Sequence, residues 1–334
     1  MKADKNTGSS LTTVEIASIW SSYMFESMVH HIFSYLINNT EDEEIKAFIE
    51  YCQVASRLHI HNYMAVFKKE NLPVPSGTTS DDVNIHAPKL FSDKFYIIYI
   101  KNMAKFALAN FAMAYSDCSR PDIRMLFKEH MERLVEIDRM AIEIKQSKNI
   151  YVTPPFVEVP SDVDFISDKK EFFAGFFTEK RPLSVLEIRQ LFINLHSNAI
   201  GEALMKGFSQ TVASKEISNY LQKGEELSRK YYKMFSDIFA EEGLDIPPSY
   251  EKEVFSVSPK ESPFSDRLML NHAVLLNAYG IGNYGLGMSQ SQRRDLMAMY
   301  GKIIVEVGMY ADNGAELLIK RHWLEQPPLI SNDK

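Results

Sequence analysis

The stretch Leu11-Thr-Thr-Val-Glu-Ile16 is repeated later in the chain as Leu183-Ser-Val-Leu-Glu-Ile188, and this repeat indicates how the whole chain is organised. The two stretches are 172 positions apart, and the same offset relates Glu70-Asn-Leu-Pro-Val-Pro75 to Glu242-Gly-Leu-Asp-Ile-Pro247. Self-similarity at a fixed offset is the signature of a duplicated structural unit. The sequence therefore predicts two copies of one fold, related by internal duplication.

The two copies also end at matching positions. After a one-residue insertion the offset becomes 173, so that Phe91-Ser-Asp-Lys94 matches Phe264-Ser-Asp-Arg267. The two copies end at Pro154-Pro155 and Pro327-Pro328. Each copy is about 145 residues long, which is a normal domain length. The expected division is a first domain over residues 1–155, a linker over 156–182 and a second domain over 183–334.

Apolar residues recur every three or four positions in both copies, which predicts amphipathic α-helices. Ser92-Asp93 and Ser265-Asp266 suit helix starts, because serine caps the first turn and an acid favours its dipole. The loop between the second and third helices is long and the other two are short, which is the connectivity of a ferritin-like four-helix bundle. The predicted fold class is all-α, with two tandem ferritin-like four-helix bundles. In the first copy the expected helices cover residues 11–38, 42–70, 91–116 and 120–148.

The composition excludes several classes of protein. With 45% hydrophobic and 24% charged residues, the 334-residue chain is neither disordered nor a disulfide scaffold. Its net charge of -7 argues against a nucleic-acid partner, since phosphate binding needs a basic face. The sequence holds no apolar run of about 18 residues and begins with a polar stretch, so we expect no membrane span and no signal peptide. Its two cysteines, Cys52 and Cys118, fit a reducing compartment, and the expected location is the cytoplasm.

A glycine motif, Gly280-Ile-Gly-Asn-Tyr-Gly285, matches the dinucleotide fingerprint G-x-G-x-x-G. That fingerprint needs a strand before it and a helix after it, whereas this stretch lies inside a helical pattern. The four glycines at 280, 282, 285 and 287 align with alanines at 107, 109, 112 and 114 in the first copy. We therefore reject a nucleotide site and interpret the small residues as positions of close helix packing.

Standard catalytic motifs are missing from the sequence. A di-metal site in a ferritin-like bundle uses Glu-x-x-His motifs, but none of the nine histidines has an acid three residues before it. There is also no G-x-S-x-G nucleophile elbow and no P-loop. The sequence thus favours a protein that is not an enzyme, although it does not decide the question.

A non-standard metal site is one alternative that the sequence leaves open. Glu26 and His30 lie one turn apart on the first helix, while His59 and Asp138 lie on apolar lines of the second and fourth helices. If these side chains met, they would suit a divalent metal such as zinc or iron. The other interpretation is a buried polar network or a solvated rim without any cofactor. The two copies differ in chemistry at every one of these positions, which favours that second interpretation.

Other polar residues fall on helices that are otherwise lined with small or apolar side chains. Asn110 and Asn283 occupy the same position in the two copies, and Glu202 and His272 lie within helices of the second copy. Buried polar groups need hydrogen-bond partners, so we interpret these residues as internal hydrogen-bonding positions. A groove beside the third helix is the place where the sequence leaves room for a small-molecule ligand, whose identity stays unknown.

Three motifs of the second copy carry a family resemblance. They are Pro263-Phe-Ser-Asp-Arg267, Arg294-Asp295 at the start of the last helix and Trp323-Leu-Glu-Gln-Pro-Pro328. The chain resembles, over nearly its full length, a family of uncharacterised proteins from spore-forming bacteria that often contain two tandem ferritin-like units. Some members are labelled spore-coat-like through distant similarity to spore coat protein F. The resemblance implies a fold and a spore association, but it implies no reaction and no catalytic residues.

The leading hypothesis from the sequence is a non-enzymatic structural or interaction protein linked to sporulation or stress. Its partners would be other proteins or further copies of itself. Two alternatives remain beside it: a metal-binding or metal-dependent protein with a non-standard site in the bundle core, and a protein that binds a small molecule between its helices.

Overall fold

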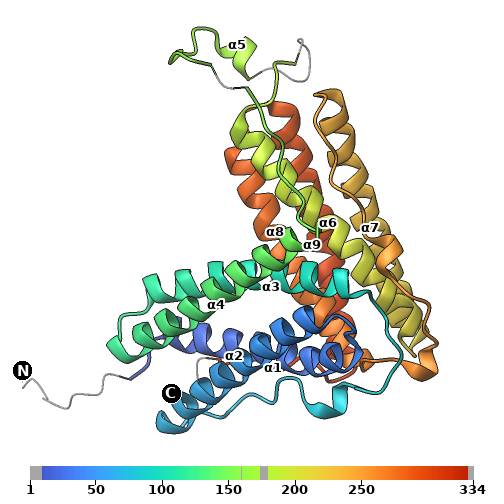
Figure 1. The fold of residues 1–334 in the computed structure, drawn as a ribbon. Helices are drawn as coiled ribbons and strands as arrows, with labels where there is room; N and C mark the ends of the chain where they lie inside the picture. The colour runs from blue at the N-terminus through green and yellow to red at the C-terminus, as the bar shows by residue number, and fades with distance from the viewer. Residues whose placement is uncertain (1–9, 159, 174–179, 330–334) are drawn as a thin grey trace, which may run out of the picture. The chain divides into compact units, whose positions relative to one another are not determined.

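The computed structural model describes residues 10–158, 160–173 and 180–329, and within them all regular structure is helical. An isolated bridge between Val83 and Phe264 is the one strand-like pairing in this part of the chain. Residues 174–179 of the linker lie outside the described residues. The long helices in Figure 1 are α1 (Thr13–Asn39), α2 (Glu43–Lys69), α3 (Asp93–Asp117), α4 (Pro121–Ser147), α6 (Val185–Thr211), α7 (Lys215–Glu241), α8 (Asp266–Gln290) and α9 (Arg294–Lys320), with a short α5 (Lys169–Phe172) in the linker.

The helices expected in the first copy are confirmed to within two residues at every end. Local capping chemistry explains why the ends fall where they do. The Thr12 side chain accepts a hydrogen bond from the Glu15 N–H, and the Glu15 carboxylate accepts one from the Thr12 N–H, which forms a capping box at α1. Ser92 caps α3 by accepting from the Phe95 N–H, as its position in the sequence predicted.

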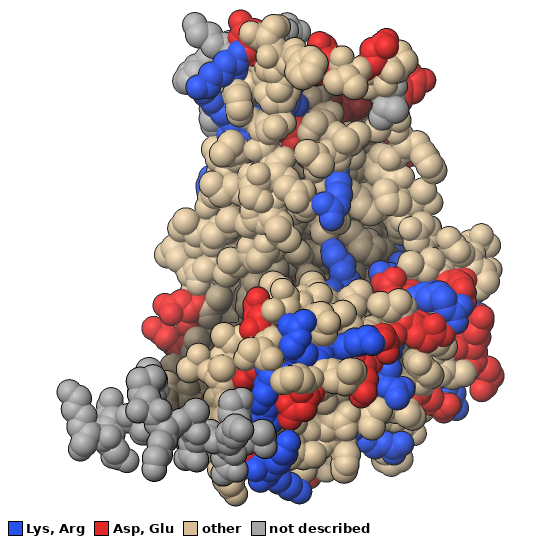
Figure 2. All heavy atoms as spheres, turned by 90° about the vertical axis from the view of Figure 1, so that its left-hand side faces the viewer, with Lys and Arg blue, Asp and Glu red and all other residues tan. Residues whose placement is uncertain are grey.

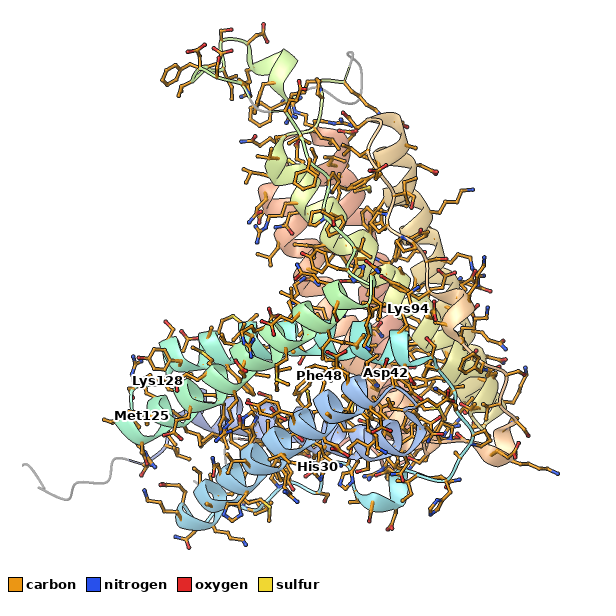
Figure 3. All side chains as sticks on the ribbon, in the orientation of Figure 1. His30, Asp42, Phe48, Lys94, Met125 and Lys128 are labelled. Atoms are coloured by element: carbon orange, nitrogen blue, oxygen red, sulfur yellow. The ribbon has the colours of Figure 1, made fainter. Side chains whose placement is uncertain are left out.

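Helices α1 to α4 form the body of the first of two compact units. Helix α1 packs on α2 and α3, and α4 packs on the same two helices, so the four close around one core. Short connections at 40–42 and 118–120 and a long one at 70–92 match the predicted order of loop lengths. The core is aromatic, and Phe48, labelled in Figure 3, is almost completely buried within it.

The first unit also includes two segments from the far end of the sequence, Ser262–Leu268 and the stretch that begins at His322. The Arg267 guanidinium forms an ion pair with the buried Asp82 carboxylate. The Glu325 carboxylate accepts hydrogen bonds from the backbone N–H groups of Ser76 (2.8 Å) and Gly77 (3.1 Å). These contacts tie down the long connection between α2 and α3.

Helices α6 to α9 form the body of the second unit, which comprises Tyr151–Glu261 and Met269–Arg321. Helix α7 packs on α6 and α9. Helix α8 reaches α6 through a hydrogen bond from the Tyr284 hydroxyl to Asn198 Oδ1 at 2.9 Å. Among the described residues the chain thus contains two helical units with the same order of long helices.

The glycine motif of the second copy lies inside α8, as expected, with no strand before it among the described residues. Close packing explains Gly287, because an added Cβ would lie 2.6 Å from the Tyr300 ring. The packing interpretation is wrong at Gly282 and Gly285, where an added Cβ would meet nothing within 4 Å. These two glycines therefore leave the surface of α8 open.

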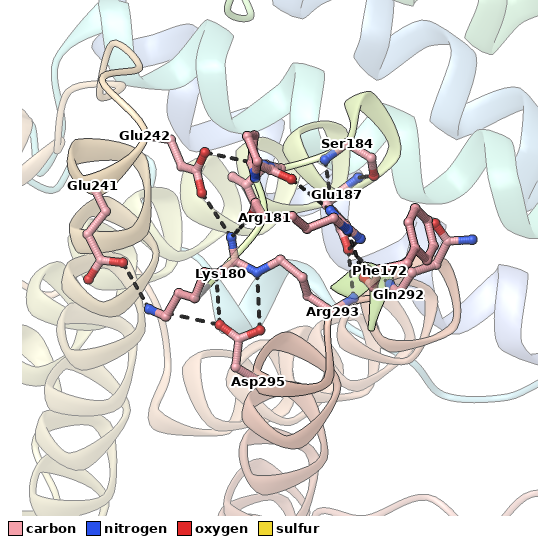
Figure 4. Close-up of polar contacts among 12 residues, drawn as sticks. Phe172, Lys180, Arg181, Ser184, Glu187, Glu241, Glu242, Gln292, Arg293 and Asp295 are labelled. Carbon is pink, nitrogen blue, oxygen red and sulfur yellow. Dashed lines mark hydrogen bonds and ion pairs between the residues drawn. The ribbon is translucent and has the colours of Figure 1, made fainter. Parts of the chain in front are cut away.

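A network of charged side chains links helix ends in the second unit, as Figure 4 shows. The buried Glu187 carboxylate accepts from the backbone N–H groups of Gln292 and Arg293, both at 2.9 Å, and pairs with Arg181 at 2.8 Å. The Arg293 side chain is completely buried and binds Asp295 at 2.7 Å. The network joins the N-terminus of α6 to that of α9.

The first unit repeats this network at its own aligned residues. Glu15 accepts from the backbone N–H groups of Ser119 (3.0 Å) and Arg120 (2.8 Å). Arg120 binds Asp122 and Glu70, each at 2.8 Å, as Arg293 binds Asp295 and Glu242 in the second unit. We call the two sets the end networks: Glu15, Glu70, Arg120 and Asp122, and Glu187, Glu242, Arg293 and Asp295.

Charged side chains of both signs lie intermixed where they gather on the face drawn in Figure 2. Some of the described ion pairs lie within one helix. On α4, for example, Arg139 binds Glu136 at 2.6 Å and Glu143 at 2.5 Å. Such exposed pairs contribute little individually to stability.

None of the described helices combines the length and the apolar character that crossing a membrane requires.

Candidate functional site

Three ionisable side chains from three different helices meet in the core of the first unit. Glu26 comes from α1, His59 from α2 and His130 from α4, and they are 3%, 1% and 1% exposed. Burying such groups is costly unless they are paired or hydrogen-bonded. The partners of these three buried side chains therefore decide what this cluster can do.

Glu26 and His59 are bonded directly. Oε1 of Glu26 lies 2.8 Å from Nδ1 of His59, so the carboxylate accepts the ring N–H of the histidine. The other ring nitrogen of His59, Nε2, is buried and has no hydrogen-bond partner among the described residues. With its Nδ1 proton held by Glu26, a neutral His59 presents a lone pair at Nε2.

The rings of His59 and His130 are stacked, with centroids 3.8 Å apart and an interplanar angle of 29°. Burial, followed by the neighbouring His59 and Arg133, lowers the pKa of His130 to about 2. His130 is therefore neutral at physiological pH. Stacked rings present their faces to one another, so their nitrogens do not converge on a common point.

His130 is held at both ring nitrogens. The Asn62 amide lies 3.3 Å from Nε2, and the Tyr63 hydroxyl lies 2.9 Å from Nδ1. Because the Asn62 amide donates to Nε2, Nδ1 carries the proton and donates to the Tyr63 oxygen. Burial, followed by the charge of Glu26, raises the pKa of Tyr63 well above its usual value, so the phenol stays protonated.

A cavity of about 30 Å³ adjoins this cluster and is lined by both Glu26 and His59. A buried water needs roughly 10–15 Å³, so the cavity has room for about two such molecules. Its remaining wall is largely apolar and includes Phe25, Val29 and Met103. Burial raises the pKa of the Cys52 thiol, which also lines the cavity, so this thiol is protonated and a poor ligand or nucleophile.

The structure places the other two residues of the predicted metal set elsewhere. His30, labelled in Figure 3, bonds the Ser56 hydroxyl through Nδ1 at 3.1 Å. Asp138 forms an ion pair with Lys101 at 2.5 Å. Within the described ranges, no three His, Cys, Asp or Glu side chains form a group that could hold a metal ion. Of the four candidates, the structure brings Glu26 and His59 into contact.

The second unit fills the aligned positions with neutral groups. Asn198, Tyr231 and Ile303 occupy the positions of Glu26, His59 and His130. Asn198 accepts a hydrogen bond from the Tyr284 hydroxyl, which stays protonated because burial raises the pKa of Tyr284. The ionisable cluster therefore belongs to the first unit alone.

Glu202 and His272, two of the predicted polar core positions, are buried in the second unit. Glu202 pairs with Arg229 at 2.7 Å, yet burial outweighs this cation and leaves the pKa of Glu202 raised. Burial lowers the pKa of His272 to about 3, so this ring is neutral. Neither residue adjoins a metal-binding group among the described residues.

The two aligned asparagines differ in their surroundings. Asn110 lies at the surface of α3, and its amide donates to the Phe106 carbonyl of the same helix at 2.9 Å. Asn283 lies on α8 with a buried Nδ2 that has no hydrogen-bond partner in the described part of the chain. The same residue type at the aligned position therefore has different hydrogen bonding in the two copies.

Sequence reasoning missed His130 and Tyr63, although a signal for His130 was present. It lies on the apolar stripe of α4 between Phe127 and Leu134, at helical spacing. A histidine on such a stripe is buried, and a buried histidine needs partners on the facing helices. Tyr63 follows His59 by one turn on α2 in the same way.

Comparisons with known proteins add a family and little else. Residues 3–163 and again 171–334 match the family described as "Protein of unknown function (DUF3231)". No curated protein matches the chain. A solved structure of a candidate spore coat protein from Bacillus halodurans C-125 is 17% identical and covers 46% of this chain and 98% of its own, with a TM-score of 0.44.

Proposed function

We propose that this chain, which belongs to the DUF3231 family of proteins of unknown function, is a structural or interaction protein and not an enzyme. The proposed architecture is two tandem ferritin-like bundles over residues 1–155 and 183–334, joined by a linker over 156–182. The proposed location is the cytoplasm, with a spore or stress association as the family resemblance implies. Other proteins or further copies of the chain are the proposed partners.

The observation that carries this proposal is the nature of the polar groups repeated in both units. Each end network joins the starts of the first and last helices and the end of the second helix, through backbone N–H groups and ion pairs. The ionisable cluster of Glu26, His59 and His130, in contrast, has no counterpart in the second unit. Duplication has thus kept the residues that hold the helix ends together, and this supports the structural proposal.

The proposal is tested by fractionating spores and vegetative cells of the source organism and detecting the protein with an antibody. We expect the protein in the spore fraction, and a soluble metabolic enzyme detected in parallel serves as the control for contamination. A protein confined to vegetative cells would contradict the spore association.

A divalent metal in the first unit is the second candidate function, and a specific observation favours it. His59 donates the N–H of one ring nitrogen to a carboxylate, and its other ring nitrogen has no partner among the described residues. A metal-binding histidine is oriented by its neighbours in the same way. In this candidate function the metal ligands would come from four side chains: Glu26, His30, His59 and Asp138. The structure groups only Glu26 and His59, so metal binding would require the others to move.

Elemental mass spectrometry of protein purified without chelator or affinity metal distinguishes the two candidates. Near-stoichiometric iron, zinc or manganese that is lost in Glu26→Gln and His59→Gln, and kept in the surface variant Glu129→Gln, would establish the metal function. Only trace metal in the native protein would leave the structural proposal in place.

A further inference from the structure

A groove of about 310 Å³ lies in the second unit, between α6 and the segment that follows α4. That segment runs along α6 in Figure 1. Its walls are apolar: Pro154, Pro155 and Val157 on one side, and Ile188, Phe192 and Ile193 on the other. The volume is at the lower end of the range for small-molecule sites, which are roughly 300–1,000 Å³. The groove therefore suits a small ligand with an apolar body.

One charged side chain, Arg189, lines this groove. Within the described part of the chain its guanidinium makes one hydrogen bond, from Nη1 to Gln290 Oε1 at a long 3.4 Å, and no ion pair. Two other arginines of the unit, Arg181 and Arg229, bind carboxylates at 2.8 Å and 2.7 Å. Arg189 thus keeps its planar set of donors available beside an apolar wall.

The charge is specific to the second copy. Arg189 aligns with Ala17 of the first copy, whereas the apolar neighbours Ile188 and Phe192 align with Ile16 and Trp20. The apolar character of this helix face is therefore common to both copies, and the cation is what distinguishes the second. A purely structural role for the face does not require the cation.

We propose that this groove binds a small monocarboxylate with an aliphatic or aromatic body. The carboxylate would pair with the Arg189 guanidinium, whose fork of N–H donors matches a carboxylate in two parallel hydrogen bonds. The apolar body would lie against Phe192 and the proline pair. A single guanidinium matches one negative charge, which favours a carboxylate over a multiply charged phosphate. This inference goes beyond the structural role proposed above and does not depend on it.

Isothermal titration calorimetry of the full chain with octanoate tests the proposal. Octanol and octylammonium serve as probes with the same chain and a neutral or positive head. We expect octanoate to bind the native protein at least about tenfold more tightly than either, because hydrogen bonds to charged groups are worth about a factor of ten or more. Equal binding of octanoate and octanol, or no octanoate binding, would overturn the proposal.

Three variants locate the site. Arg189→Gln should weaken octanoate binding by at least about tenfold, and Arg189→Lys, which keeps the charge without the planar fork, should lie between it and the native protein. Arg294→Gln removes an exposed arginine of the same unit outside the groove and should bind as the native protein does. Native-like binding by Arg189→Gln, or an equal loss in Arg294→Gln, would refute the assignment. Circular dichroism of each variant shows whether it is folded, and spore fractionation, which tests the structural proposal, is unaffected by either result.

Discussion

His130 shows how strongly the core of the first unit disfavours a charge. Its ring is 1% exposed, stacked on His59 and held neutral, with a pKa lowered from 6.5 to about 2. The folded state therefore resists a proton that the unfolded chain accepts readily. Stability tied to this residue is full above pH 6.5 and is lost as the pH falls from there toward 2.

Replacing His130 by glutamine should therefore make the free energy of unfolding fall less steeply as the pH is lowered. Between about pH 6 and 4 the native protein should lose about 1.4 kcal/mol of unfolding free energy per pH unit more than the variant, since one proton is involved. Denaturant unfolding at a series of pH values measures this difference. His86→Gln, which alters an exposed histidine, should keep the native slope. An unchanged slope in His130→Gln would show that His130 is protonated in the folded protein.

The hydrogen-bonded pair of Glu26 and His59 stabilises the same core. Removing His59 alone leaves a buried carboxylate without its partner, so His59→Ala should lower the unfolding free energy by about 3 kcal/mol or more. Adding Glu26→Ala should then cost less than it does in the native background. Urea unfolding of the two single variants and the double variant gives the coupling. Additive losses would mean that the two side chains do not interact.

At the scale of elements, the sequence predicts the helices well because their determinants are local. Apolar spacing and capping residues such as Thr12 and Ser92 act within one helix, and every predicted end in the first unit lies within two residues of the observed one. The composition of α8 was harder to interpret. Its glycines share a helix and a motif, yet only Gly287 among Gly282, Gly285 and Gly287 faces a close neighbour.

Two alanine substitutions on α8 separate these roles. Gly282→Ala should raise the unfolding free energy by up to about 1 kcal/mol, because glycine is a poor helix former and the added Cβ meets open space. Gly287→Ala should lower it by about 1–3 kcal/mol, because its Cβ would clash with Tyr300. Thermal and denaturant unfolding measure both variants. Equal stability of the two would contradict the packing of α8 on α9 at this point.

The site was less predictable than the helices for a physical reason. Glu26 and His59 could be singled out because polar residues on apolar helix faces stand out in a sequence. Their contact depends on how α1 and α2 are rotated against each other, which no local pattern specifies. Asp138 lay on an apolar line by spacing, but the long side chain of Lys101 reaches it and forms a partly exposed ion pair.

At the scale of the whole chain, segments of the second copy hold a loop of the first unit. Glu325, in the Trp-Leu-Glu-Gln-Pro-Pro motif, accepts the backbone N–H groups of Ser76 and Gly77. Glu325→Ala should therefore speed amide hydrogen exchange at these two positions, while Asp312→Ala on α9 should not. Exchange at native rates in Glu325→Ala would show that the loop is held by other contacts.

The duplication itself conserves the end networks across the chain. Burial would raise the pKa values of Glu15 and Glu187, but the hydrogen bonds from Thr12 and Arg120 in the first unit, and from Arg181 and Ser184 in the second, bring each to about 2. A carboxylate whose pKa falls from 4.5 to about 2 on folding contributes about 3 kcal/mol at neutral pH. That contribution is lost as the pH falls from 4.5 toward 2.

The free energy of unfolding of Glu15→Gln and Glu187→Gln at neutral pH tests whether the residues repeated in both copies hold the fold. Each variant should lose about 3 kcal/mol, as the pKa shift requires, while the exposed control Glu129→Gln should stay within about 0.5 kcal/mol of the native protein. Native stability in both network variants would contradict a structural role for these carboxylates.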